Sequence, residues 1–139
     1  MIILSVDYGR VRTGVAVCDR DEIIASPVAV IKEVRQEVLA EKIAALSREK
    51  QAKMIVLGLP KNMDGSEGES AQNVRSFAKL LKEKTGLPLE LQDERCTTVS
   101  AHSYLNVTDT RGKKRKDVID SVSAVIILED HIRYRRNRL

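Results

Sequence analysis

Acidic side chains adjoin strongly patterned segments at three separate places in the chain. Asp7 directly follows a short apolar run, Asp93 and Glu94 end an alternating segment, and Asp120 lies near the start of a long amphipathic stretch. A buried, isolated carboxylate is costly, whereas hard divalent cations with oxygen ligands relieve the repulsion between several carboxylates. If these acids meet, the sequence predicts a site for Mg²⁺ or Mn²⁺.

Such a site favours hydrolysis of phosphodiester bonds. Two cations roughly 4 Å apart can activate water and stabilise the leaving oxygen of an in-line displacement, without help from histidine or cysteine. His102 and His131 stand alone in expected helices, and Cys18 and Cys96 form no CxxC motif or Cys/His cluster. The serines and threonines also lack a histidine placed to complete a hydrolase triad. We therefore expect metal-dependent chemistry.

Each acid also has a purely structural explanation. Asp7 could accept hydrogen bonds from the turn that follows it, and a helix N-terminus could stabilise Asp120. Asp120, however, lies beside the apolar stripe of its helix and should lean toward the sheet, whereas Asp117 fits the exposed cap. Strand alternation lets only one of Asp93 and Glu94 face the site, and the apolar pattern leaves both alternatives open.

Hydrophobic periodicity predicts the strands that must position these acids. Short β-branched runs and period-2 alternation are typical of strands. The continuous apolar run MIVLGL indicates a strand buried on both faces of a parallel sheet. Strands are expected at residues 2–6, 14–18, 23–30, 54–59 and 87–94.

Apolar residues at helical spacing predict the helices. The first is expected over residues 35–51. Ser66, with Glu69 three residues later, matches a capping box before the second helix, which Gly86 ends. Further along we expect a short helix through Leu105, then a basic loop, then a closing helix from Asp117.

This order predicts an α/β fold. An antiparallel hairpin sheet would be extended by two right-handed parallel crossovers, with helices on both faces. Ligands of such sheets bind beyond the carboxyl ends of the parallel strands, which share one edge. With 139 residues, no internal repeat and no long linker, the chain is expected to form a single domain over residues 1–139.

Basic residues are concentrated late in the chain. The net charge is +4, with five basic residues between Arg111 and Lys116 and four between Arg133 and Arg138. Such clusters attract polyanions, so we expect contact with nucleic-acid phosphates. Aromatic residues are only 3%, which argues against base stacking. Asp7 interrupts the apolar N-terminal run too early for a signal peptide or a membrane span, so a cytoplasmic protein without membrane contact is expected.

Five sequence blocks resemble the YqgF family, also known as RuvX-like Holliday junction resolvases. They follow one another in the family's order across nearly the whole chain: residues 7–16 (DYGRVRTGVA), 58–68 (GLPKNMDGSEG), 74–78 (VRSFA), 93–98 (DERCTT) and 118–128 (VIDSVSAVIIL). The resemblance implies a ribonuclease H-like fold with a five-stranded mixed sheet. It also implies a bacterial nuclease that processes the 5' end of the 16S rRNA precursor in ribosome biogenesis, with Holliday junction resolution as the older assignment.

The resemblance also assigns the site residues. The family's acidic positions fall on Asp7, Glu94 and Asp120, which favours Glu94 over Asp93. Its basic patch and further phosphate contacts correspond to Arg10, Arg12, Arg95, Lys113, Lys114, Arg115 and Lys116. Whether the MDGSEG loop contacts substrate stays open.

Two further classes of protein compete with a nuclease. ATPases of the actin and sugar-kinase type share an Asp-x-Gly hairpin on a ribonuclease H-like core, but they enclose the nucleotide between two domains, and 139 residues supply one. A catalytically silent RNA-binding module is the other, and the intact acids argue against it. We expect pre-16S rRNA or branched DNA as partners of a monomer or weak homodimer.

Overall fold

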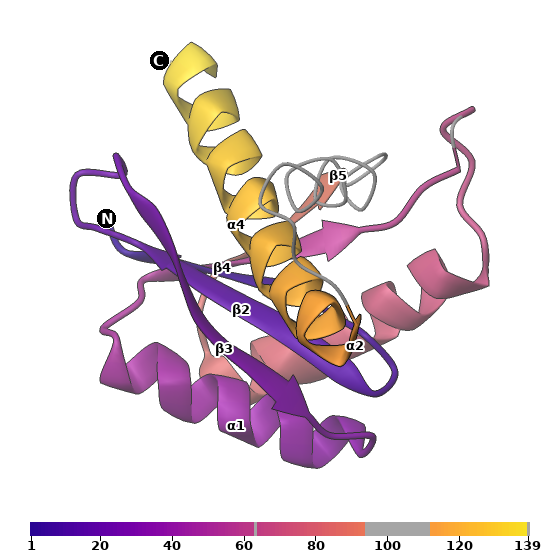
Figure 1. The fold of residues 1–139 in the computed structure, drawn as a ribbon. Helices are drawn as coiled ribbons and strands as arrows, with labels where there is room; N and C mark the ends of the chain where they lie inside the picture. Colours follow the sequence, from indigo (N-terminus) through magenta and orange to yellow (C-terminus); the bar gives the residue numbers. More distant parts are fainter. Residues whose placement is uncertain (63, 94–111, 139) are drawn as a thin grey trace.

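One mixed β-sheet forms the centre of the molecule (Figure 1). The computed structural model describes residues 1–62, 64–93 and 112–138, with the backbone alone for 112–121 and 138. The strands lie in the order β3-β2-β1-β4-β5. β1 pairs antiparallel with β2, β2 antiparallel with β3, and β4 parallel with both β1 and β5. The strands are β1 (Ile3–Asp7), β2 (Arg12–Cys18), β3 (Ala25–Lys32), β4 (Met54–Leu59) and β5 (Leu89–Asp93).

Helices cover both faces of this sheet, as the sequence predicts. Helices α1 (Gln36–Glu49) and α2 (Glu69–Thr85) pack on one face, and α4 (Gly112–Arg138) crosses the other (Figure 1). Strand alternation divides the core, because Leu4 and Val6 of β1 point to α1 and α2 while Ile3 points to α4. Every residue of β4 is buried, in agreement with its continuous apolar sequence.

Helix α4 runs opposite to β1, and one contact near its middle and one near its carboxyl end establish this direction. The buried Ser5 hydroxyl donates a hydrogen bond to the Ala124 carbonyl at 2.7 Å. Eleven residues later, the Arg135 guanidinium pairs with Glu22 at 2.7 Å, in the turn between β2 and β3. That turn lies at the amino end of β1, because Val17 near the end of β2 pairs with Leu4. The start of α4 therefore lies toward the carboxyl end of β1.

The start of α4 corrects one sequence prediction. The helix begins at Gly112, so Lys113 to Lys116 belong to its first turns and not to a loop, and Asp117 is not its cap. The apolar stripe begins only after Asp117, but lysine and arginine have high helix propensity and extend the helix without it. The predicted helix through Leu105 lies outside the described residues.

Two local hydrogen-bond networks correct other boundaries. Ser66 does not cap α2: the N-cap is Gly68, and the Ser66 hydroxyl donates to Asp64 at 2.6 Å within the preceding loop. Ile23 and Ile24 are not in a strand, because their N–H groups bond the Asp19 carboxylate and close a turn before β3. Within the described residues, no helix is long and apolar enough to cross a membrane.

Candidate active site

The carboxyl ends of β1, β4 and β5 meet at one edge of the sheet. Val6 pairs with Leu57, and Leu59 pairs with Asp93. Asp7 and Asp93 therefore end their strands on either side of β4. Two strand spacings amount to about 10 Å, so acids from these two strand ends can approach a shared pair of cations.

Side-chain alternation assigns each acid to a face of the sheet. Ser5 bonds the carbonyl of Ala124 in α4, so Asp7, two residues later, has the same face. On β5 the Gln92 amide lies 3.2 Å from the His131 ring of α4, whereas Leu91 packs into the core beneath α1 and α2. Asp93 shares the face of Leu91 and is thereby directed away from α4. Glu94 lies outside the described residues.

The hairpin after Asp7 explains its Asp-x-Gly sequence. A Cβ atom at Gly9 would lie 2.0 Å from the Arg12 carbonyl oxygen, so only glycine lets the chain close this turn. The Gly9 N–H donates to the Thr13 hydroxyl at 3.2 Å, and Thr13 is fully buried. Asp7 itself is paired with Gly14. The turn thus holds the end of β1 in one conformation.

Tyr8, the residue after Asp7, is anchored on the opposite face of the sheet. Its ring stacks on Phe77 of α2, with ring centroids 4.4 Å apart and planes 17° from parallel. The Tyr8 hydroxyl accepts a hydrogen bond from the Gln36 amide of α1 at 2.9 Å. Because neighbouring residues of a strand point to opposite faces, this anchor keeps Asp7 directed to the α4 side.

Helix α4 brings position 120 to the same edge. Asp120 lies one helical turn before Ala124, about 6 Å along the helix axis, and Asp7 lies about 7 Å beyond Ser5 along β1. Since Ser5 bonds Ala124 and α4 runs opposite to β1, the two displacements point the same way. The backbones at residues 7 and 120 are therefore displaced by similar distances from the Ser5–Ala124 hydrogen bond, toward the same edge of the sheet.

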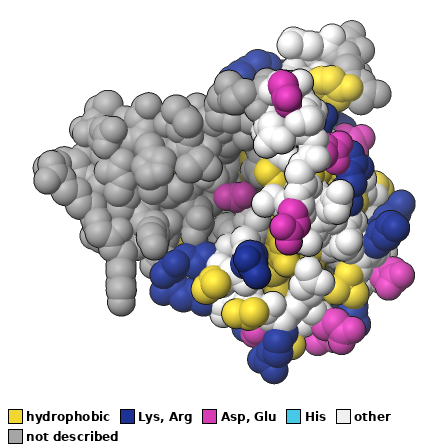
Figure 2. All heavy atoms as spheres, turned by 90° about the vertical axis from the view of Figure 1, so that its right-hand side faces the viewer, with side chains coloured by type: hydrophobic (Ala, Val, Ile, Leu, Met, Phe, Trp, Pro, Cys, Tyr) yellow, Lys and Arg dark blue, Asp and Glu magenta, His cyan; other side chains and the backbone are white. Residues whose placement is uncertain are grey.

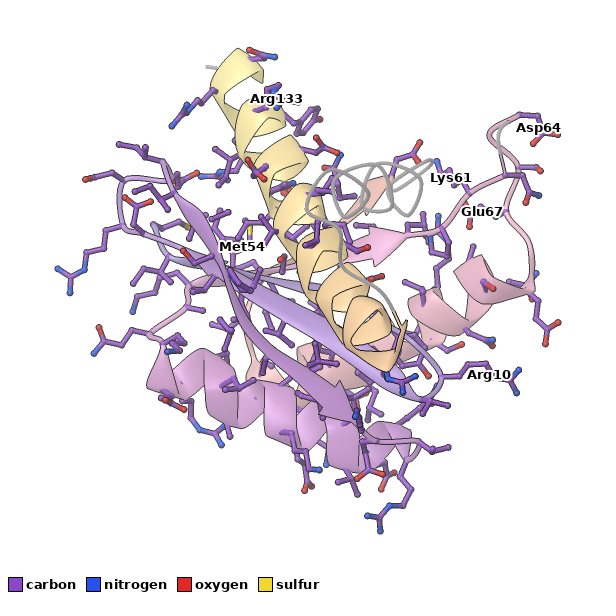
Figure 3. All side chains as sticks on the ribbon, viewed as in Figure 1. Arg10, Met54, Lys61, Asp64, Glu67 and Arg133 are labelled. Carbon is purple, nitrogen blue, oxygen red and sulfur yellow. The ribbon has the colours of Figure 1, made fainter. Side chains whose placement is uncertain are left out.

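The basic residues expected to contact phosphates are only partly described. Arg10 is exposed and extends from the hairpin away from the sheet (Figure 3), while Arg12 is half-buried. Figure 2, which faces this edge, shows lysine and arginine side chains interspersed with acidic ones on the described surface. Arg95 and the side chains of Lys113, Lys114, Arg115 and Lys116 lie outside the description.

Of the three expected metal ligands, only Asp7 has a described side chain. Asp7 is half-buried and ends its strand at this edge, so its carboxylate oxygens suit a hard cation. Among the described side chains, no three acids, histidines or cysteines gather around a common point. Glu94 and the side chain of Asp120 are outside that set.

The structure gives positions to two residues that the sequence analysis did not place. His131 is 1% exposed, and its ring nitrogens lie 3.2 Å from Glu90 and 3.2 Å from Gln92 of β5, so it packs between α4 and the sheet. Lys61 follows β4 by two residues and so reaches the same edge as Asp7. The sequence feature that could have indicated Lys61 is a basic residue that directly follows a buried parallel strand and Pro60.

Comparison with known proteins identifies the family. Residues 1–134 match the family model described as RuvX: Holliday junction resolvase. The chain belongs to this family. It is 42% identical over 136 residues to a Rhodopirellula baltica protein named "Putative pre-16S rRNA nuclease", covering 98% of this chain and 79% of that protein. A Clostridioides difficile protein of the same name is 41% identical over 135 residues, covering 97% of this chain and 96% of that one.

A solved structure supports the fold. The structure titled "T. thermophilus RuvC in complex with Holliday junction substrate" superimposes with a TM-score of 0.61 over 99% of this chain and 96% of that chain, at 12% identity. The chain therefore has the ribonuclease H-like fold of the RuvC-type resolvases, as the sequence predicts.

Proposed function

We propose that this RuvX-family chain is a metal-dependent nuclease that trims the 5' end of pre-16S rRNA during ribosome biogenesis. Family membership and the names of its relatives support nuclease chemistry and this substrate. The observation that carries the proposal is the placement of Asp7, which is held at the end of β1 on the α4 face by the Gly9 turn and the Tyr8 anchor.

Asp7, Glu94 and Asp120 are the proposed ligands of the cations. The family implies a divalent cation in general, and we propose Mg²⁺ or Mn²⁺ because all three ligands are carboxylates. When bound, the ions supply an activated water and charge stabilisation for the leaving oxygen. Glu94 is preferred to Asp93 because alternation in β5 directs Asp93 to the α1 and α2 side.

The chain's own residues would position the nucleic acid. Arg10 and Arg12 in the hairpin, Arg95 after β5, and Lys113, Lys114, Arg115 and Lys116 in the first turns of α4 are the proposed phosphate contacts. Replacing Lys113, Lys114 and Lys116 together by alanine should weaken RNA binding and flatten its salt dependence, while metal binding persists. An unchanged salt slope would remove these lysines from the interface.

A cleavage assay tests the proposal. The wild type and the Asp7→Asn, Glu94→Gln and Asp93→Asn variants are incubated with labelled pre-16S rRNA in Mg²⁺, Mn²⁺ or EDTA. Loss of a metal ligand removes several kcal/mol of transition-state stabilisation, so Asp7→Asn and Glu94→Gln should cleave at least about 100-fold more slowly. Asp93→Asn is the matched control and should stay near the wild type.

Other outcomes favour the competing functions. A four-way DNA junction is included because the family description and the RuvC complex point to it as a second candidate substrate. Preferential cleavage of the junction would favour a resolvase, binding without cleavage under every condition would favour an RNA-binding module, and ATP turnover would favour the kinase-like alternative. We further propose that residues 1–139 form a single cytoplasmic domain without membrane contact, active as a monomer or weak homodimer.

A further inference from the structure

The loop between β4 and α2 is held in shape by its own hydrogen bonds. The Asn62 N–H donates to the Ser66 carbonyl and the Gly65 N–H to the Asn62 carbonyl, both at 2.8 Å. Gly65 has a φ of 89°, a left-handed conformation that favours glycine. The Asp64 carboxylate accepts from both the N–H and the hydroxyl of Ser66. Residue 61, directly before this closed turn, therefore has a defined position.

That position lies at the candidate active edge. Lys61 is two residues beyond the end of β4, or about 7 Å of extended chain. β4 lies between β1, which carries Asp7, and β5. Figure 3 shows Asp64 at the outer end of the loop, with Lys61 and Glu67 nearer to the sheet.

The acidic residue at the end of this loop, before α2, is already paired. Glu67 receives two hydrogen bonds from the Arg75 guanidinium of α2, at 2.7 and 2.8 Å. These bonds lower the pKa of Glu67, and the charge of Lys61 lowers it further, so Lys61 is close enough to act on Glu67 electrostatically. The two-point geometry of guanidinium and carboxylate favours Arg75 over a lysine as the partner.

Glu67 is thereby committed to Arg75 and does not form an ion pair with Lys61. Lys61 is half-buried, and no carboxylate of the described residues forms an ion pair with it. A half-buried ammonium at the edge of a phosphodiester-cleaving site is suited to bind a phosphate oxygen.

We propose that Lys61 binds a backbone phosphate of the nucleic acid beside the cleaved bond, and that the Arg75–Glu67 ion pair positions it by keeping Glu67 from neutralising it. This inference rests on the proposed nuclease function and extends it to a residue and a loop. Arg75 acts through Glu67 and does not itself contact the phosphate.

The test measures binding without cleavage. A fluorescein-labelled single-stranded RNA of 20 nucleotides is titrated with full-length protein in EDTA at several NaCl concentrations. Removing one phosphate contact should reduce the slope of log affinity against log salt by about 0.7, which is about a fivefold loss at 0.1 M salt. Lys61→Gln should show this loss, Lys61→Arg should not, and Lys79→Gln, an exposed lysine of α2, should match the wild type.

A second set of variants tests the role of Arg75. Arg75→Gln releases Glu67 to pair with Lys61, so its slope should fall as in Lys61→Gln. Adding Glu67→Gln to Arg75→Gln removes the competitor and should restore the wild-type slope, while Glu67→Gln alone should change little. A direct phosphate contact by Arg75 would not be restored, so failure of the double variant to recover overturns the positioning role.

The outcomes separate this inference from the proposed function. If the wild type binds and cleaves RNA but Lys61→Gln keeps its slope, or Lys79→Gln loses as much, the assignment of Lys61 is overturned and the nuclease proposal is untouched. If the wild type neither binds nor cleaves nucleic acid, the proposed function is wrong and this inference with it. Thermal unfolding of each variant verifies that it is folded. Arg75→Gln and its double variant with Glu67→Gln test the role of Lys61 without altering Lys61 itself.

Discussion

Three glycines of this chain should respond differently to the same methyl group. At Gly9 an added Cβ lies 2.0 Å from the backbone oxygen of Arg12, an overlap that no side-chain rotation can relieve. At Gly86 the space is open but φ is +68°, and at Gly68 the space is open and φ is −103°. Alanine substitutions therefore distinguish a steric requirement for glycine at Gly9, a conformational requirement at Gly86, and no requirement at Gly68.

The magnitudes follow from these geometries. Gly9→Ala must displace the hairpin backbone by roughly 1 Å, which costs about 3 kcal/mol, the upper end of overpacking effects. Gly86→Ala pays about 1–2 kcal/mol for the left-handed conformation. Gly68→Ala should stay within about 1 kcal/mol, the range for replacing a glycine N-cap. For a chain of this length, Gly9→Ala should lower Tm by about 12 °C.

Urea denaturation followed by circular dichroism measures these free energies of unfolding. RNA cleavage at a temperature where all three variants are folded then reports on the site. Gly9→Ala should lose activity beyond its loss of stability, because its turn positions Asp7, while the other two should remain active. If Gly9→Ala is as stable and active as Gly68→Ala, the steric account of the Asp-x-Gly turn is wrong.

Three further predictions concern the supports of the sheet. Hydrogen bonds from Arg135 lower the pKa of Glu22, so this pair stabilises the fold above pH 4.5, and the gain disappears as pH falls through the lowered pKa. Glu22→Gln should cost about 1–2 kcal/mol at pH 7 in urea titrations, and progressively less as the pH is lowered below 4.5; a pH-independent difference would contradict this. Phe77→Ala should cost about 3–5 kcal/mol and slow cleavage through the loss of the Tyr8 stack, whereas an unchanged Tm would show that the stack is dispensable. Burial raises the pKa of the Cys18 thiol, so iodoacetamide should label it only after unfolding, and rapid labelling of the folded protein would refute its burial.

The sheet could be predicted from the sequence because its signals are local and redundant. The buried run of β4 and the Asp-x-Gly turn after β1 each have one geometric solution, and right-handed crossovers then restrict the strand order. Helix starts were less predictable. Ser66 matches a capping box, but the same hydroxyl serves a turn with Asp64, and a short sequence pattern does not rank two local hydrogen-bond arrangements.

The candidate site shows the same division. That the ends of β1 and β5 share one edge followed from parallel pairing alone. The face of Asp93 did not, because it depends on the register of β5 and on the contact between Gln92 and His131, two residues that are 39 positions apart in the chain. The sequence does not single out Lys61 for a similar reason: its lack of an ion pair with Glu67 depends on the pairing of Glu67 with Arg75.

The most direct test of the central claim is a crystal structure of the wild-type protein soaked in Mn²⁺, with data collected at the manganese absorption edge. The account predicts anomalous peaks at the carboxyl edge of the sheet, about 2.1 Å from oxygens of Asp7, Glu94 and Asp120. Peaks bound by Asp93 in place of Glu94, or no peak beside Asp7, would contradict it.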